Sequence, residues 1–165
     1  MADFQSVYLP SERWDELLVA DASGLPPFRI ATHQGDWWLS ENTTGKLVNV
    51  GNRHLAGLGL WTVSVRGVGY YDKTTKRLDL SPGSGVTLVR EPENPYDGNA
   101  IAVTAAGETV GYVNKGMAKR LAVLMDDGKP FEVFVLSGSP AGADLDGPLK
   151  IVAASPKSIA HIRRR

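Results

Sequence analysis

Apolar residues in the first 60 positions occur in short stretches separated by turn-forming residues. Ser11 precedes an acidic and then apolar run, which is typical of an N-cap and first helical turn, and Gly24 would end this helix. Pro26 and Pro27 disfavour its continuation. Apolar side chains, often alternating with polar ones, then mark short strands at Phe28–Thr32, Trp37–Leu39 and Lys46–Val50. We therefore predict a short helix followed by a small β-meander over residues 25–50.

Longer strand-like runs begin after Leu60, separated by glycine- and proline-containing turns. The predicted strands are Trp61–Tyr71, Val86–Arg90, Asn99–Ala105, Thr109–Val113, Phe131–Leu136 and Leu149–Ala154. This pattern predicts a mainly β protein. Its core would be a small OB-like β-barrel of about six strands with one or two short helices, to which the N-terminal β-meander is an extension.

The clearest predicted helix follows Asn114, a residue suited to an N-cap. Met117, Leu121 and Leu124 then recur at helical spacing until Gly128 supplies a C-terminal glycine. A last short helix is predicted to start at Ser155 and Pro156. We divide the chain into an N-terminal extension (1–58), a barrel domain (59–156) and a basic C-terminal tail (157–165).

Charge and composition narrow the possible functions. The 165 residues carry 18 Lys+Arg and 18 Asp+Glu, so the net charge is zero and a purely charge-driven grip on nucleic acid is excluded. The tail residues Arg163–Arg165 could add phosphate affinity or form a solvated terminus. The absence of cysteine excludes disulfides and thiolate chemistry. With no apolar stretch of membrane-spanning length and no signal-peptide pattern, we expect a cytoplasmic protein that does not bind membranes.

The densest group of chemistry-bearing residues lies in the segment 90–103. Pro92 and Pro95 stiffen the connection between two predicted strands. Tyr96 and Asp97 then lie near its apex, before Gly98 turns the chain back. They could form an exposed binding site. The alternative is a simple turn in which Asp97 caps its own backbone and Tyr96 packs beneath the loop.

A second candidate site is the Tyr70–Tyr71 pair at the end of the predicted first strand. Neighbouring residues on a strand point to opposite faces, so one ring could face the core and the other a groove. The alternative is that both tyrosines are packing residues.

These residues resemble the HIRAN domain family in order and spacing over residues 60–155. The resemblance is carried by the runs Arg66–Tyr71, Leu88–Val103 with its EPENPYDGNAIAV core, and Gly111–Lys115. Two positions depart from a member of the family, which has arginine at the position of Gly69 and histidine at that of Tyr112. HIRAN domains occur at the N-terminus of helicase-like DNA-repair ATPases and as small bacterial and phage proteins. The resemblance implies an OB-like barrel that captures the free 3′ end of single-stranded DNA.

The resemblance also implies roles for individual residues. Tyr70 and Tyr96 would stack on the terminal bases, and Asp97 would accept a hydrogen bond from the 3′ hydroxyl. Asn94 and Lys115 would help to hold the nearby phosphate. The complete predicted DNA-binding set is Tyr70, Tyr71, Arg90, Asn94, Tyr96, Asp97, Tyr112 and Lys115. Possible partners beyond DNA are a helicase or a repair or phage protein.

Other activities find little support in the sequence. There is no GK[ST] phosphate loop, and His33, His54 and His161 lack metal-ligand spacing, so we expect no ATPase motor, metal or cofactor. Three clustered acids, Glu91, Glu93 and Asp97, could suggest a nuclease, but no nucleophile or matching base accompanies them, and loop solvation explains them better. We therefore expect no enzyme.

The competing hypothesis is a protein–protein interaction module. Trp37 and Trp38 of the N-terminal extension could form an exposed apolar patch that docks a partner. In that case the barrel would serve only as a scaffold.

Overall fold

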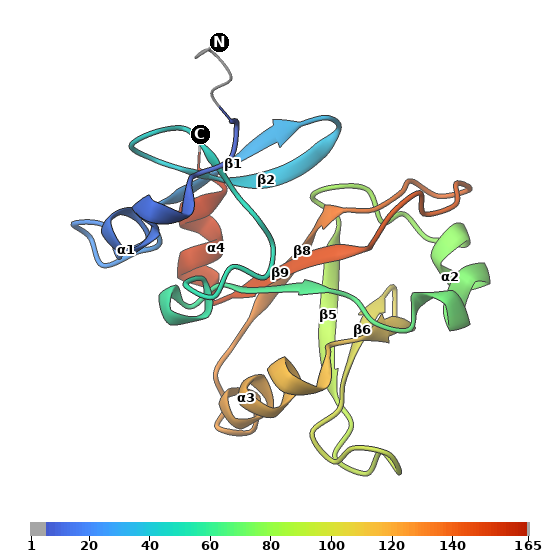
Figure 1. Ribbon diagram of the computed structural model, residues 1–165. Coiled ribbons are helices and arrows are strands. Elements are labelled where there is room, and N and C mark those ends of the chain that lie inside the picture. Colours follow the sequence, from blue (N-terminus) through green and yellow to red (C-terminus); the bar gives the residue numbers. More distant parts are fainter. Residues whose placement is uncertain (1–5, 165) are drawn as a thin grey trace.

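The computed structural model describes residues 6–164. The N-terminal extension contains a three-stranded antiparallel sheet in the order β1-β2-β3, formed by β1 (Phe28–His33), β2 (Asp36–Glu41) and β3 (Leu47–Val48) (Figure 1). The predicted β-meander is therefore present. The turn between β2 and β3 is organised by the buried Glu41 carboxylate, which accepts hydrogen bonds from the backbone N–H groups of Thr43 and Thr44, both at 2.9 Å.

The second sheet is a curled, six-stranded antiparallel sheet (Figure 1). Its order is β4-β9-β8-β5-β6-β7, and its strands are β4 (Trp61–Ser64), β5 (Gly85–Arg90), β6 (Ile101–Ala105), β7 (Glu108–Tyr112), β8 (Glu132–Ser137) and β9 (Lys150–Ala154). An isolated bridge between Arg66 and Tyr112 joins the segment that follows β4 to the end of β7, with N···O distances of 2.8 and 2.9 Å. The curled sheet thereby forms a small barrel whose edges meet at this one bridge, and the predicted mainly β, OB-like fold class is confirmed.

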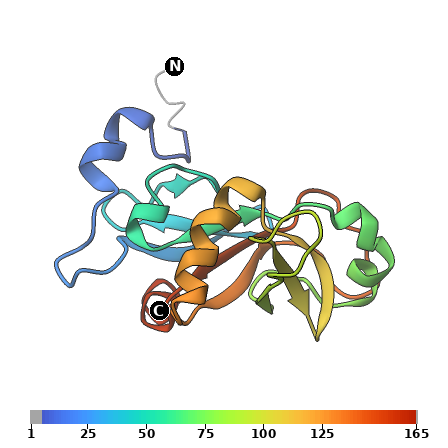
Figure 2. The same ribbon diagram turned by 90° about the horizontal axis from the view of Figure 1, so that it is seen from below.

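Short helices connect and cover these sheets (Figure 2). They are the 3-10 helices η1 (Ser11–Arg13), η2 (Ala56–Leu58) and η3 (Val68–Tyr71), and the α-helices α1 (Trp14–Leu17), α2 (Asp72–Arg77), α3 (Lys115–Asp126) and α4 (Pro156–Ile162). The two helices predicted from capping residues are capped as expected: Asn114 accepts from Met117 N at 2.9 Å, and Ser155 accepts from Ser158 N at 3.2 Å. Gly128 follows α3 with a φ of +83°.

Two hydrophobic cores hold the molecule together. One fills the barrel and includes Val63, Ile101 and Leu121, all at most 1 % exposed. The other joins the N-terminal extension to the barrel, with Phe28 and Leu39 packed in one cluster with Phe134 of β8 and Ile162 of α4. The extension is therefore packed against the barrel through a shared core, and burial of this apolar surface stabilises their association.

Two predictions about local structure were wrong. The predicted strand Trp61–Tyr71 ends at Ser64, because Gly67 adopts a left-handed conformation with φ +77° and starts η3. Tyr70 and Tyr71 therefore lie on a 3-10 helix and do not alternate across a strand. The first helix ends at Leu17 and not near Gly24.

The basic residues after α4 are not simply solvated. The Arg163 guanidinium lies 5.1 Å from the ring centroid of Trp37 and 4.7 Å from that of Phe134. Arg164 donates to the carbonyl oxygen of Phe28 at 3.0 Å. Arg165, the last residue of the predicted tail, lies outside the described residues. Among the helices of residues 6–164, none is long and apolar enough to span a membrane.

Candidate nucleic-acid interface

Tyr70 projects from η3 with 91 % of its surface exposed, although it is a large aromatic residue. The left-handed Gly67 turns the chain out of the barrel wall immediately before it, and Tyr70 N donates to the Gly67 carbonyl at 3.0 Å. Tyr71 behaves differently, because it is half-buried with its ring centroid 6.5 Å from that of Tyr112. One tyrosine of the pair is thus free to meet a ligand, and the other contacts the end of β7.

The loop between β5 and β6 is held by hydrogen bonds centred on Glu91. Tyr112 donates through its hydroxyl to both Glu91 carboxylate oxygens, at 3.0 and 3.1 Å, and the Asn94 amide donates to one of them at 2.9 Å. The Asn94 side-chain oxygen accepts in turn from the backbone N–H groups of Tyr96 and Asp97. These contacts fix the loop beneath the Tyr96 ring, which is 89 % exposed.

Asp97 both caps its own turn and presents one carboxylate oxygen that is open to a ligand. Its Oδ1 atom accepts a hydrogen bond from Asn99 N at 2.9 Å, so the carboxylate does cap its own turn. Its Oδ2 atom accepts no hydrogen bond from any residue between 6 and 164. One carboxylate oxygen at the loop apex is therefore available to a donor such as a sugar hydroxyl.

Tyr112 and Asn94 support the loop from below. Burial and the hydrogen bond to Glu91 raise the pKa of the Tyr112 phenol, which stays protonated and continues to donate. The Asn94 side chain forms hydrogen bonds within the loop through both its nitrogen and its oxygen. Both residues were included in the predicted DNA-binding set, and the structure places them where they position Tyr96 and Asp97.

The two predicted cationic contacts differ in their surroundings. Arg90 is 15 % exposed, and its guanidinium pairs with both carboxylate oxygens of Asp126, at 2.9 and 3.1 Å, while also donating to the Ala100 carbonyl. The pKa of Arg90 is raised by this pairing with Asp126 and, to a smaller extent, by the charge of Asp97. Lys115 is exposed in the first turn of α3 and makes no ion pair with the described residues. Lys115 is thus free for a phosphate, whereas Arg90 ties β5 to α3.

Sequence reasoning missed two residues of this region. Glu91, which we attributed to loop solvation, is the half-buried acceptor of the Tyr112 and Asn94 hydrogen bonds. Arg66 forms the barrel-closing bridge with Tyr112 and leaves its own side chain exposed there. The isolated position of Arg66 before the glycine turn was the only sequence signal for it, and nothing local signalled the pairing of Glu91 with Tyr112, 21 positions away.

The predicted residues are therefore linked by contacts that run from η3 to the loop apex. Tyr71 contacts Tyr112, Tyr112 bonds Glu91, Glu91 bonds Asn94, and Asn94 bonds the backbone that carries Tyr96 and Asp97. Arg90 stands apart in its ion pair with Asp126. The result is two exposed rings and one partly free carboxylate on a region that is internally hydrogen-bonded.

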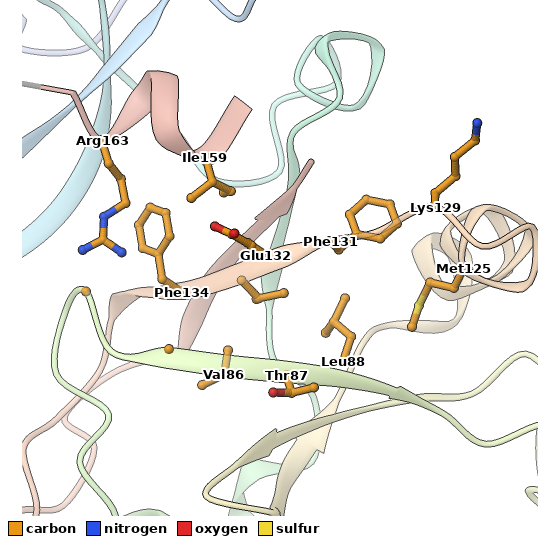
Figure 3. Close-up of a pocket in the computed structure, with 13 residues that line it drawn as sticks. Val86, Thr87, Leu88, Met125, Lys129, Phe131, Glu132, Phe134, Ile159 and Arg163 are labelled. Carbon is orange, nitrogen blue, oxygen red and sulfur yellow. The ribbon is translucent and has the colours of Figure 1, made fainter. Parts of the chain in front are cut away.

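One large hollow lies away from this region and another lies within it. A groove of about 490 Å³ lies where β5 diverges from β8, and Figure 3 shows Met125 and Lys129 at one end and Arg163 at the other. It contains none of the predicted DNA-binding residues. A shallow depression of about 480 Å³ lies over Glu91–Pro95. Within residues 6–164 there is no group of three or more His, Asp or Glu side chains placed to hold a metal ion.

Trp37 and Trp38 do not form an exposed apolar patch. The Trp37 ring packs edge-on against Phe134 at a centroid distance of 5.8 Å. It lies so close to Gly83 that a Cβ there would approach the indole within 2.6 Å. Trp38 is also half-buried and contacts Tyr8, with ring centroids 5.5 Å apart. Both tryptophans are engaged in packing, which removes the observation that would favour a docking surface at this position.

Comparison with known proteins places these features in a family. The model of the HIRAN domain matches residues 58–141, about half of the chain. The rabbit (Oryctolagus cuniculus) protein named helicase-like transcription factor is 42 % identical over 64 residues. These residues are 38 % of this chain and only 6 % of that relative, so the chain spans a small part of its length.

The chain is also similar to parts of two solved structures. The crystal structure of the HIRAN domain of human HLTF is 29 % identical, covering 63 % of this chain and 83 % of the other, with a TM-score of 0.45. The solution structure of the HLTF HIRAN domain in its DNA-bound conformation is 26 % identical, covering 63 % of this chain and 82 % of the other, with a TM-score of 0.40.

Proposed function

The chain belongs to the HIRAN domain family, as its sequence motifs predicted, and we propose that it is a DNA-binding module that captures the free 3′-hydroxyl end of single-stranded DNA. The proposal places DNA on η3 and the β5–β6 loop. Tyr70 and Tyr96 stack on the terminal bases, Asp97 accepts from the 3′ hydroxyl, and Lys115 contacts a nearby phosphate.

The exposure of two large aromatic rings carries this proposal. Tyr70 and Tyr96 are 91 % and 89 % exposed, yet both stand on backbone that is fixed by a glycine turn or by hydrogen bonds. An exposed ring does not contribute the free energy that its burial would add to folding. Exposed aromatic side chains of this kind serve as stacking surfaces for bases. Stacking on a ring face tolerates any base, so the binding has little sequence preference.

Asp97 supplies the preference for a particular end. An ionised carboxylate only accepts hydrogen bonds, so its free Oδ2 atom pairs with a hydroxyl and repels a terminal phosphate. Two stacked bases at about 1–3 kcal/mol each and one charge-assisted hydrogen bond at about 1.5–3 kcal/mol total roughly 4–9 kcal/mol before ordering costs. The terminal site alone therefore binds in the millimolar to micromolar range.

The wider context of the proposal follows from the relatives. One relative is named helicase-like transcription factor, and a module that holds a 3′ end suits a partner that acts on DNA ends or forks during repair or replication. In this proposal the domain binds DNA and leaves catalysis to such a partner. The cytoplasmic location expected from the sequence stays a prediction.

Fluorescence anisotropy with two short oligonucleotides tests the proposal. The strands share one sequence, and one ends in a 3′ hydroxyl while the other ends in a 3′ phosphate. We expect the hydroxyl-ended strand to bind at least tenfold more tightly, which corresponds to about 1.4 kcal/mol. Equal affinities for the two strands would refute end recognition.

Four variants, two of which are controls, locate the site in the same assay. Asp97→Ala should abolish the preference while retaining part of the affinity, and Asp146→Ala is its matched control, because Asp146 is an exposed acid with no ion pair in the described chain. Tyr96→Ala should lower the affinity for both oligonucleotides. Tyr96→Phe keeps the ring face and should bind them nearly as tightly as wild type does. If neither Asp97→Ala nor Tyr96→Ala alters DNA binding, the proposed site is wrong.

A further inference from the structure

A small hollow separates the N-terminal extension from α3 on the barrel. It has a volume of about 70 Å³, and its lining includes Asn52, Arg53, Thr62, Met117 and Arg120. The turn with η2 and the helix α3 lie beside each other at this point (Figure 2). Two arginines from different parts of the fold, one in the extension and one in α3, therefore face one space.

Both guanidinium groups are held over tryptophan rings. Arg53 lies 5.3 Å from the ring centroid of Trp14, and Arg120 lies 5.2 Å from that of Trp61, which is only 7 % exposed. Stacking of this kind orients a guanidinium while leaving its N–H donors at the edge available. Each arginine is thus positioned by packing, before any ligand is present.

Neither arginine is neutralised by a described carboxylate. The six ion pairs formed within residues 6–164 involve other side chains. An acid close to the extension side is Asp15, and its carboxylate is bonded to His54 Nε2 at 2.9 Å. Two like charges that face one hollow repel each other, so an anion placed between them would be favoured. Guanidinium groups match phosphate in both charge and hydrogen-bond geometry.

We propose that this hollow binds a backbone phosphate of the DNA strand, upstream of the captured 3′ end, so that the N-terminal extension takes part in DNA binding. This inference rests on the proposed function. α3 begins at Lys115 beside the terminal site, and Arg120 lies five residues later, about 7.5 Å along the helix axis and about 140° around it. Lys119, which is also exposed and unpaired in the described chain, shares a face with Lys115 between these points.

The hollow is therefore separated from the terminal site by a distance that a few nucleotides span. Successive phosphates of a DNA strand are about 3.4 Å apart along a duplex axis and further apart when a single strand is extended. Two or three nucleotides therefore cover roughly 7.5 Å along the helix axis, and a few more follow the path around the helix. A dinucleotide would occupy only the terminal site. A longer strand would reach both the terminal site and the hollow.

Strand length separates the two sites in an experiment on the full chain. Binding of a dinucleotide and of an octanucleotide, both with a 3′ hydroxyl, is measured for wild type, Arg53→Gln, Arg120→Gln and the double variant. Glutamine removes the charge and keeps an aliphatic stem over each tryptophan. Arg29→Gln is the matched control, since Arg29 is an exposed arginine of the extension without an ion pair in the described chain. Thermal unfolding verifies that every variant is folded.

The expected result is a loss that depends on length. The double variant should bind the octanucleotide about tenfold more weakly and the dinucleotide as wild type does, while Arg29→Gln changes neither. The slope of log K against log salt for the octanucleotide should fall by about 0.7, the value for one phosphate contact on a single strand. An unchanged octanucleotide affinity, or an equal loss for both lengths, would overturn the inference.

Two further outcomes separate this inference from the proposed function and from a free-ion site. If the wild type does not distinguish a 3′ hydroxyl from a 3′ phosphate, end capture fails. The proposed phosphate site in the hollow is still supported if the affinity for the octanucleotide falls when Arg53 and Arg120 are replaced. If inorganic phosphate alone quenches Trp14 and Trp61 fluorescence at low millimolar concentration while the octanucleotide affinity ignores both arginines, the hollow is a site for a free anion and the strand contact is refuted.

Discussion

The Tyr112 hydroxyl donates hydrogen bonds to both carboxylate oxygens of Glu91, at 3.0 and 3.1 Å. Tyr112 also closes the barrel through its backbone bridge to Arg66, and Glu91 begins the loop that carries Tyr96 and Asp97. The barrel closure and the proposed DNA site thus meet at one residue, Tyr112, through its backbone and its side chain respectively. The integrity of the closing strand should therefore influence how well the loop presents its ligand groups.

Replacement of Tyr112 by phenylalanine should lower both stability and DNA affinity. It removes a hydrogen bond to a half-buried carboxylate, for which we expect a loss of about 1–2 kcal/mol in the free energy of unfolding. The loop should also bind a 3′-hydroxyl strand more weakly, because Glu91 then holds Asn94 less firmly. Urea unfolding and anisotropy measure the two effects. Tyr96→Phe, which removes a hydroxyl with no partner in the described chain, should leave stability unchanged; a similar loss there would contradict this role for Tyr112.

Alkaline pH should destabilise the protein partly through Tyr112. Burial and Glu91 raise the pKa of this phenol above its ordinary value of 10.0. The unfolded chain then releases the phenol proton at lower pH than the folded chain does. The stabilisation of the folded state by the protonated phenol is therefore complete below about pH 10 and declines as pH rises further. Urea unfolding between pH 8 and 11 should show a smaller decline for Tyr112→Phe than for wild type. Identical declines would show that Tyr112 does not carry the effect.

A side chain at position 111 should disrupt the barrel closure. A Cβ on Gly111 would approach the Arg66 carbonyl oxygen within 2.6 Å and would also meet the Val65 side chain. Neither group can move without shifting the segment that bridges to β7. We expect Gly111→Ala to cost about 1–3 kcal/mol in the free energy of unfolding, measured with urea. Gly147→Ala, at a position with no atom within 4 Å of the added Cβ, should stay within about 0.5 kcal/mol of wild type.

The parts of the fold that were predictable are those set by neighbouring residues. Alternation identified the meander and most barrel strands, and local capping chemistry at Asn114 and Ser155 predicted the starts of α3 and α4. The family motif identified the loop that bears Tyr96 and Asp97. These signals extend over a few residues, so they can be read from the sequence without knowing the tertiary contacts.

The features that were missed depend on contacts between distant residues or on backbone conformation. Gly67 looked like a tolerable strand residue, but its positive φ ends the strand and moves Tyr70 and Tyr71 onto η3. The ion pair of Arg90 was not predicted, because its partner, Asp126, lies 36 positions away. The packing of Trp37 against Phe134 depends likewise on how the extension folds back onto β8. The pattern of apolar and polar residues along the sequence does not indicate such pairings between distant residues.

Acid should weaken the turn around Asp21 in the N-terminal extension, together with its contact to α4. Asp21 accepts hydrogen bonds from Ser23 and Leu25 N and pairs with His161 Nε2 at 2.9 Å. These contacts, with the Ser23 hydroxyl contributing most, lower the pKa of Asp21 from 3.8 to about 2. A lowered pKa in the folded state means that the stabilisation is complete above about pH 4 and disappears as pH falls towards 2. Wild type should therefore have a higher Tm than Asp21→Asn at pH 6, and the difference should shrink between pH 4 and pH 2.

The control for this acid effect is Asp146→Asn, which removes an exposed carboxylate without a described partner. Its Tm should follow that of wild type across the same pH range. A Tm difference between wild type and Asp21→Asn that persists unchanged at pH 2 would mean that the Asp21 charge is not its cause.

Arg90 should prove to be a structural residue and not a direct DNA contact. Its guanidinium spans Asp126 and the Ala100 carbonyl, which joins β5, β6 and α3. Arg90→Gln should lower the free energy of unfolding by about 1 kcal/mol, or Tm by about 2–4 °C. Because no phosphate contact is lost, the dependence of DNA affinity on salt should keep the wild-type slope, whereas Lys115→Gln should reduce that slope by about 0.7. A reduced slope for Arg90→Gln, measured by anisotropy at several salt concentrations, would instead place Arg90 against the DNA backbone.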